Sequence, residues 1–293
     1  MRAPIRDTEL FFDIDGAALV LDKSGMRQRP TAFLVHGGPG ADHTGFKTRY
    51  GGLADKMQLV YFDQRGQGRS ARGNVEKYTL DENVEDMEAL RRYLGLEQII
   101  SIGASYGGMV ALAHAARYPQ SVSHLIAIVT ASHAGFIDRA KQLVRERGTP
   151  EQVELCDDVF AGRIDTPEKM RHYDEVMGSL YARRFEPALL RDGLDRIIRS
   201  PEALNRAYSP SGCMRTFDLR PELKAITAPT LIIAGRHDWI CPPELSEEIH
   251  RLVSGSDLRI FEESGHLISG DEPQQLLDVI AGFVVYKTGT ESR

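Results

Sequence analysis

The sequence has 293 residues, of which 42% are hydrophobic and 27% are charged, with a formal net charge of −6. This composition is typical of a folded globular protein and excludes disordered and fibrous classes. Arg and Lys are interspersed with Asp and Glu, so there is no basic field for a polyanion and we expect no nucleic-acid partner. No stretch approaches the roughly 20 apolar residues of a membrane span. The first residues lack the apolar core of a signal peptide, and we expect a cytoplasmic protein that does not bind a membrane.

The three cysteines, Cys156, Cys213 and Cys241, are too few and too widely spaced for a disulfide framework or a CxxC metal site. We expect reduced thiols and no metal. The sequence leaves the oligomeric state open.

The first part of the chain alternates apolar strand patterns with helical ones. Residues 10–16 and 17–22 predict a strand pair with a turn at Asp15-Gly16. Continuous apolar runs, as in strands buried on both faces of a parallel sheet, occupy 31–35, 59–62, 99–102 and 125–129. Residues 81–94 carry apolar side chains at helical spacing, with Asp81 as the expected N-cap, and 106–117 predict a second helix.

The pattern then becomes helical. Segments rich in Arg and Glu follow one another at 136–148, 167–184 and 187–199, without a strand signal between them. Strands resume at 230–234 and 258–261, and an apolar helix at 274–286 closes the fold. This order predicts an α/β fold with a mostly parallel, doubly wound sheet and an inserted helical cap. We expect the core to comprise 1–133 and 217–293 and the cap 134–216.

The stretch SIGASYGG at 101–108 contains Ser105 between glycines two residues away on each side. A strand pattern precedes it and a helix pattern follows. A nucleophile elbow needs this strand, tight turn and helix, with small residues beside the serine. Ser105 is therefore the predicted nucleophile rather than part of a structural glycine turn.

A serine hydroxyl needs a base, and the base needs an orienting acid. Asp238 follows the strand at 230–234, and His266 follows the strand at 258–261. Parallel sheets hold their sites at these carboxyl ends, and the order Ser, acid, His is that of α/β hydrolases. We predict that Asp238 orients His266, which acts as the general base.

The oxyanion of a tetrahedral intermediate needs backbone donors. The amide of Tyr106, directly after the nucleophile, is one candidate. The loop His36-Gly-Gly-Pro-Gly40 follows the strand at 31–35, and its glycines allow a sharp turn that brings an N–H close to the substrate. Gly38 is the predicted second donor.

Five motifs together resemble the proline iminopeptidase (prolyl aminopeptidase) branch of the α/β-hydrolase superfamily. They are HGGPG at 36–40, DQRGQGRS at 63–70, GASYGG at 103–108, GRHD at 235–238 and SGH at 264–266. The resemblance implies a serine aminopeptidase without metal or organic cofactor, which releases an N-terminal residue, often proline, from short peptides or amides through an acyl-enzyme. It also implies that Asp63, Arg65 and Ser70 hold the loops around the site.

A substrate ammonium requires a carboxylate, because an unpaired buried charge is very costly. Family members often place a glutamate where the chain returns from the cap, or directly after the triad acid. Here 209–215 reads SPSGCMR and Trp239 follows Asp238, so neither place has an acid. The acidic residues left to take this role are Asp42, Asp174, Glu175 and Glu186.

Two alternatives to an aminopeptidase remain open. Four residues are expected to contact the substrate: Gly37, Phe136, Glu175 and Trp239. The first alternative is a carboxylesterase or lactonase acting on a small apolar acyl compound. It is favoured by the absence of acids at the two expected places and by Phe136 and Trp239 as pocket walls. A non-catalytic protein of this fold that binds a small molecule is the more remote alternative, since Ser, Asp and His are all present.

Overall fold

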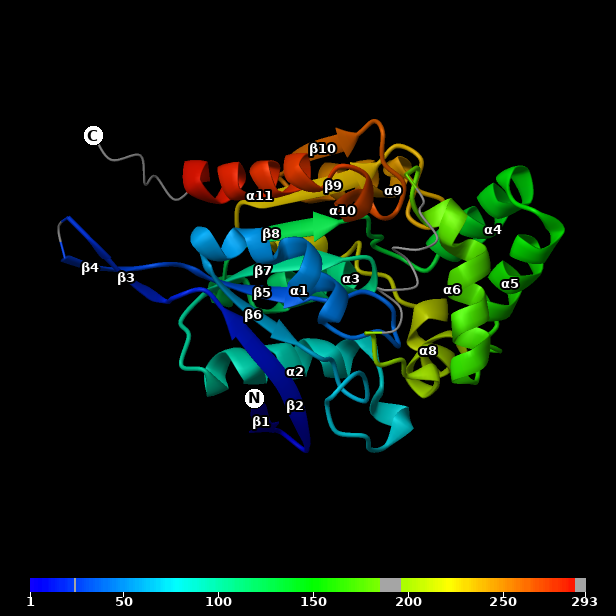
Figure 1. Cartoon of the computed structure of the whole chain (residues 1–293), viewed down its shortest axis with the longest axis horizontal. Helices are drawn as coiled ribbons and strands as arrows, with labels where there is room; N and C mark the ends of the chain where they lie inside the picture. Colours follow the sequence, from blue (N-terminus) through cyan, green and yellow to red (C-terminus); the bar gives the residue numbers. More distant parts are fainter. Residues whose placement is uncertain (24, 185–195, 288–293) are drawn as a thin grey trace.

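The computed structural model describes residues 1–23, 25–184 and 196–287. Its centre is an eight-stranded sheet in which the second strand of the chain runs antiparallel to both of its neighbours and the other described pairs of strands run parallel (Figure 1). In spatial order the strands are β1 (Arg2–Ile5), β2 (Thr8–Asp15), β6 (Gln58–Phe62), β5 (Thr31–Val35), β7 (Ile99–Ala104), β8 (Val122–Ile128), β9 (Thr230–Gly235) and β10 (Asp257–Phe261). The predicted mostly parallel sheet is confirmed.

Helices cover both faces of this sheet, which explains why its central strands are apolar throughout. On one face, α2, α3 and α9 pack in one buried cluster with the strands; on the other, α1, α10 and α11 pack in a second. The helices are α1 (Thr44–Tyr50), α2 (Leu80–Tyr93), α3 (Tyr106–Arg117), α9 (Pro243–Leu252), α10 (Ile268–Asp271) and α11 (Pro273–Lys287). Short 3-10 turns are η1 (Gly51–Asp55), η2 (Val75–Lys77), η3 (Pro119–Ser121), η4 (Cys213–Arg215) and η5 (Leu223–Ala225).

The predicted strand pair around Asp15-Gly16 is wrong. β2 pairs with β1 and β6 instead, and β3 (Leu19–Asp22) pairs with β4 (Gly25–Gln28) in a separate hairpin. Burial explains the difference, because β2 inserts Leu10 and Phe12 into the main core while Leu19 and Leu21 remain exposed. A strand gains more by extending a large sheet than by closing a solvent-exposed hairpin.

The N-cap of α2 is Thr79, not Asp81 as predicted. The Thr79 side chain accepts the Glu82 N–H at 3.2 Å. Asp81 lies in the first turn, where a carboxylate favours the helix dipole, and pairs with Arg117 at 2.7 Å. Thr and Asp are both good N-caps, so residue type does not distinguish them. The position of each residue relative to the packed face of the helix decides which one caps it.

Between β8 and β9 the chain forms four described helices: α4 (Phe136–Arg147), α5 (Pro150–Phe160), α6 (Pro167–Tyr181) and α8 (Pro201–Tyr208). They gather at the carboxyl end of the sheet (Figure 1). The segments that lead into and out of these helices lie side by side. His133 and Asp218 form an antiparallel backbone β-bridge, and the Ala134 N–H donates to the Phe217 carbonyl at 2.9 Å. Glu186 and most of the helix expected at 187–199 lie outside the described residues. None of the described helices is long and apolar enough to cross a membrane.

Candidate active site

Ser105 lies in the turn between β7 and α3, in an unusual backbone conformation. Its φ of 56° and ψ of −125° are strained for a residue with a side chain. Two contacts hold the turn: the Ser105 N–H donates to the Ile128 carbonyl at 2.9 Å, and the Thr130 hydroxyl donates to the Ser105 carbonyl at 2.8 Å. Strand β8 and the residues that directly follow it therefore hold Ser105 in this conformation at the carboxyl end of β7.

The glycines around Ser105 are required by close backbone approach. A Cβ on Gly103 would lie 2.1 Å from the Gly107 carbonyl oxygen. A Cβ on Gly107 would lie 2.0 Å from the carbonyl oxygen of Val35, on the neighbouring strand β5. Both distances are far below any van der Waals contact, so only glycine allows the strand, turn and helix to pack this tightly.

Asp238 and His266 meet across the ends of β9 and β10. His266 Nδ1 lies 2.7 Å from Asp238 Oδ2, and both side chains are buried. The other carboxylate oxygen, Oδ1, accepts the N–H groups of Ile240 at 2.8 Å and Cys241 at 3.0 Å. Asp238 is thus fixed by the backbone, and its hydrogen bond leaves Nε2 as the free nitrogen of His266.

Ser105 is at the same edge of the sheet as this pair. Ser105 directly follows the last residue of β7, and β7 is separated from β9 by β8 alone, a distance of about 10 Å at a spacing near 4.8 Å per strand. In the described part of the chain no hydrogen bond joins Ser105 Oγ to His266. Such bonds are often long until substrate is present.

The glycine-rich loop lies against the serine. A Cβ on Gly37 would be 3.2 Å from Ser105 Cβ and 3.8 Å from its Oγ. Gly38 is solvent-exposed with a φ of +125° and precedes a cis bond to Pro39. Tyr106 is the first residue of α3, so its N–H has no carbonyl partner within the helix. Tyr106 thus directly follows Ser105, and Gly38 directly follows the loop glycine that lies against it.

The segment 63–70 braces this loop. The Gln67 side chain accepts the Gly40 N–H at 2.6 Å, a contact that motif reading missed. The Asp63 carboxylate accepts hydrogen bonds from Nδ1 of the His43 ring and from the Arg69 N–H, both at 2.7 Å. Burial is the largest single influence and raises the pKa of Asp63, but the hydrogen bonds from His43 and the Arg69 N–H and the charges of His36 and His43 together hold it below its usual value.

Arg65 and Ser70 connect the same segment to the rest of the core. Arg65 forms a buried bidentate pair with Asp86, at 2.7 Å for both contacts. The Ser70 hydroxyl donates to the Asp63 carbonyl at 2.6 Å and accepts the Phe11 N–H at 2.9 Å. These contacts tie the loop to α2 and β2.

Helix α6 spans the site from one loop to the other. Met170 approaches the glycine loop, where a Cβ on Gly40 would be 3.4 Å from its methyl carbon. Eleven residues later the Tyr181 ring stands edge-on to His266, with centroids 5.6 Å apart, and to Trp239 at 5.7 Å. Asp174 shares this helix face, because residues four and eleven apart align along one side.

Asp174 forms an ion pair with Arg199. The next residue, Ser200, donates its N–H to the Gly40 carbonyl at 2.9 Å, so the pair lies beside the glycine loop. Burial raises the pKa of Asp174 to about 6, although Arg199 acts to lower it. A pocket of about 220 Å³ adjoins the pair and is lined by Pro167, Glu168, Arg171, Asp174, Ile197 and Arg199. Sequence reasoning missed Tyr181 and Arg199, which no local motif distinguishes.

The other residues expected to contact substrate have different surroundings. Phe136 is buried between the rings of Phe160 and Phe217, and none of the three lines the described pocket. Trp239 is equally buried, beneath Tyr181. Glu175 is exposed on the outer side of α6.

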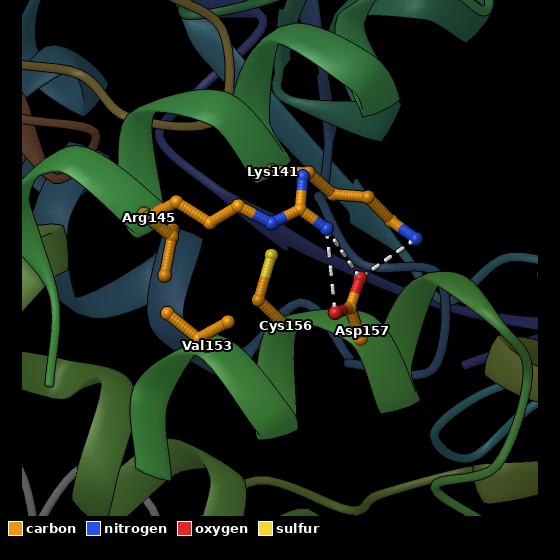
Figure 2. A pocket seen from close by; sticks show the side chains of 6 residues that line it. Lys141, Arg145, Val153, Cys156 and Asp157 are labelled. Carbon is orange, nitrogen blue, oxygen red and sulfur yellow. Dashed lines mark hydrogen bonds and ion pairs between the residues drawn. The ribbon is translucent and has the colours of Figure 1, made fainter. Parts of the chain in front are cut away.

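A second hollow, between α4 and α5, is too small for a ligand. Figure 2 shows Asp157 bridging Lys141 at 2.9 Å and Arg145 at 3.5 Å, next to the Cys156 thiol. The space between them does not admit a water molecule. Burial raises the pKa of Cys156 to about 12, so this thiol is unreactive. Among the described residues no cluster of His, Cys, Asp or Glu could hold a metal ion.

Comparisons with known proteins agree with this fold. Residues 31–273 match the sequence model of the family described as alpha/beta hydrolase fold. Proline iminopeptidase PfmaB of Pestalotiopsis fici is 32% identical over 88% of this chain and 92% of its own length. The proline iminopeptidase of Saccharolobus solfataricus is 28% identical over 85% and 83%. The crystal structure of proline iminopeptidase from Mycobacterium smegmatis superposes with a TM-score of 0.79 over 100% of this chain and 99% of its own, at 20% identity.

Proposed function

The chain belongs to the α/β-hydrolase family, in its proline iminopeptidase-like branch, and we propose that it is a serine aminopeptidase acting on short peptides or amino-acid amides. One observation carries the proposal. A strained serine at the end of β7 lies at the same sheet edge as a buried Asp238–His266 pair at 2.7 Å. This is the arrangement that nucleophilic acyl transfer needs.

In the proposed reaction, Ser105 Oγ attacks the carbonyl carbon of the scissile amide. His266 Nε2 takes the hydroxyl proton and then delivers it to the leaving amine as the C–N bond breaks. Water, deprotonated by the same imidazole, hydrolyses the resulting acyl-enzyme and restores Ser105. Asp238, held by two backbone N–H groups, keeps the proton of His266 on Nδ1 and stabilises the imidazolium.

Charge develops on the carbonyl oxygen during both steps. The N–H groups of Tyr106 and Gly38 are the proposed donors to this oxyanion. Gln67 supports the second of them, because it fixes Gly40 two residues further along the same loop. A preorganised donor contributes more than one that must first reorient.

Asp174 is the proposed partner of the substrate ammonium. It is the acid on the face of α6 that also carries Met170 and Tyr181, and a carboxylate has room for a second donor beside Arg199. Glu175 is exposed on the opposite side. We propose that the cap comprises 134–216 and that its helix α6 closes over the bound N-terminal residue.

A second candidate is an esterase or lactonase that acts on an uncharged acyl compound. One observation favours it: Arg199 already forms an ion pair with Asp174, so this carboxylate does not need a substrate ammonium to balance its charge. Both candidates use the same nucleophile and base, and they differ only in the need for a free amine.

The test compares prolyl and alanyl arylamides with their N-acetylated forms and with short-chain aryl esters. An aminopeptidase should lose at least about 100-fold in kcat/KM on acetylation, since the charge-assisted contact and the fit are both lost. Equal rates for free and acetylated substrates would contradict it and favour the esterase. Ser105→Ala should abolish turnover of all substrates; normal turnover by this variant would refute both candidates.

A further inference from the structure

Asp271, at the end of α10, is a fully buried carboxylate that binds only backbone N–H groups. Its Oδ2 accepts from Gly265 at 2.9 Å and from Arg183 at 3.1 Å, and its Oδ1 accepts from Arg184 at 2.8 Å. The side chain is 0% exposed. No cationic side chain of the described residues pairs with it, so these three donors alone compensate its burial.

The three donors come from two parts of the molecule. Gly265 directly precedes His266, whereas Arg183 and Arg184 follow the last turn of α6. A fourth bond joins the same parts, because the Leu267 N–H donates to the Tyr181 carbonyl at 2.8 Å. The end of α6 is therefore hydrogen-bonded directly to Leu267 and connected through Asp271 to Gly265, the two residues on either side of His266.

Close packing accompanies these bonds. A Cβ on Gly265 would be 2.8 Å from the Tyr181 carbonyl oxygen, so the two backbones are in direct contact. The Tyr181 ring then rests edge-on against the imidazole. The position of His266 thus depends on the end of α6 as well as on Asp238.

We propose that Asp271 is a positioning residue, which fixes the His266 loop to the end of α6 so that helix and histidine keep one geometry. This role rests on the proposed function, since it matters only if His266 acts on Ser105.

The test variant is Asp271→Asn, which preserves shape but replaces one acceptor oxygen with a donor NH₂ group. At least one of the three N–H groups then faces another donor, and the loop must shift to relieve it. A displacement near 1 Å in a catalytic group costs on the order of 100-fold in rate. Asp278→Asn on the exposed face of α11 is the matched control, because Asp278 contacts only Gln274 among the described residues.

The measurement is covalent labelling of Ser105 by a fluorophosphonate, which depends on activation of the serine and on no particular substrate. Final stoichiometry gives the fraction of competent sites, and the second-order rate constant reports on the histidine. We expect complete labelling of Asp271→Asn with a rate constant roughly 100-fold lower, and Asp278→Asn within twofold of the unmodified protein.

A merely structural role would give a different result. It would lower the melting temperature or the stoichiometry of Asp271→Asn and leave the rate constant per labelled site unchanged, which would overturn the proposal. If Asp271→Asn does not fold, Asp271→Glu keeps the carboxylate and shifts the loop by one methylene, with the same expected loss and the same refuting result. Absence of labelling in the unmodified protein would refute the proposed function itself, and this inference with it.

Discussion

Replacing Asp174 with asparagine should weaken the binding of substrates that carry a free amine and leave acetylated amides and esters unaffected. The variant keeps the size of the side chain and removes its charge. Arg199 retains an amide oxygen as a partner. The effect of the substitution should therefore measure the contact between the carboxylate and the substrate ammonium, and not a collapse of the pocket.

The magnitude follows from the contact and from its ionisation. Hydrogen bonds to charged groups contribute roughly 1.5–3 kcal/mol, so KM for a prolyl arylamide should rise about 10- to 100-fold. Burial raises the pKa of Asp174 to about 6. The carboxylate is then roughly 10% ionised at pH 5 and roughly 90% at pH 7, while the substrate amine stays protonated below about pH 7.7. KM of the unmodified protein should therefore fall as pH rises from 5 to 7.

The assay is initial-rate kinetics of prolyl arylamide hydrolysis at half-unit steps between pH 5 and 8. Asp174→Asn should lack the fall in KM near pH 6. Glu175→Gln, one residue further on the exposed side of α6, is the matched control and should retain it. If Asp174→Asn keeps the pH dependence, or if both variants behave alike, Asp174 does not bind the ammonium and the esterase interpretation gains support.

Two further predictions concern the scaffold. Gly107→Ala should prevent accumulation of folded protein, because the new Cβ would lie 2.0 Å from the Val35 carbonyl oxygen, and the yield of soluble protein checks this. A Cβ on Gly282 in α11 meets nothing within 4 Å, so Gly282→Ala should stabilise the protein by about 0.5–1 kcal/mol, which thermal unfolding measures. Arg65→Met should lower the free energy of unfolding in urea by about 3 kcal/mol, because it removes the bidentate partner of the buried Asp86 and leaves Arg6, at 2.9 Å, as its cationic partner. Burial already raises the pKa of Asp86, so the loss should grow as pH rises and the carboxyl ionises; a pH-independent loss would contradict this reasoning.

The parallel strands and the tight turn at Ser105 could be predicted because their causes are local. Strands covered on both faces must be apolar throughout, and β5 matches its predicted range of 31–35. Ser105 could be identified because the strained turn requires glycines at fixed distances, and a Cβ at either flanking glycine would collide with backbone. Where a structural constraint comes from residues close in the sequence, the local sequence pattern is enough to predict it.

Contacts between distant segments could not be predicted in the same way. β2 joined the main sheet because of burial that depends on β6, which lies more than 40 residues away. Arg199 and Asp174 meet only when the cap folds, and nothing in either segment marks the pair. Asp271 reads as an ordinary helix-terminal acid, and its proposed role depends on backbone donors that follow α6 or precede His266.

The same distinction explains why the chemistry of this protein is easier to infer than its substrate. Ser105, Asp238 and His266 each follow a strand of one sheet, so the core alone places them at one edge. The groups proposed to surround the substrate come from α6 and from the segment at Arg199, and these segments contact the glycine loop and the His266 loop. Substitutions in α6 can therefore change which acyl group is accepted while the core chemistry persists, provided that the Asp271 contacts at the end of the helix are kept.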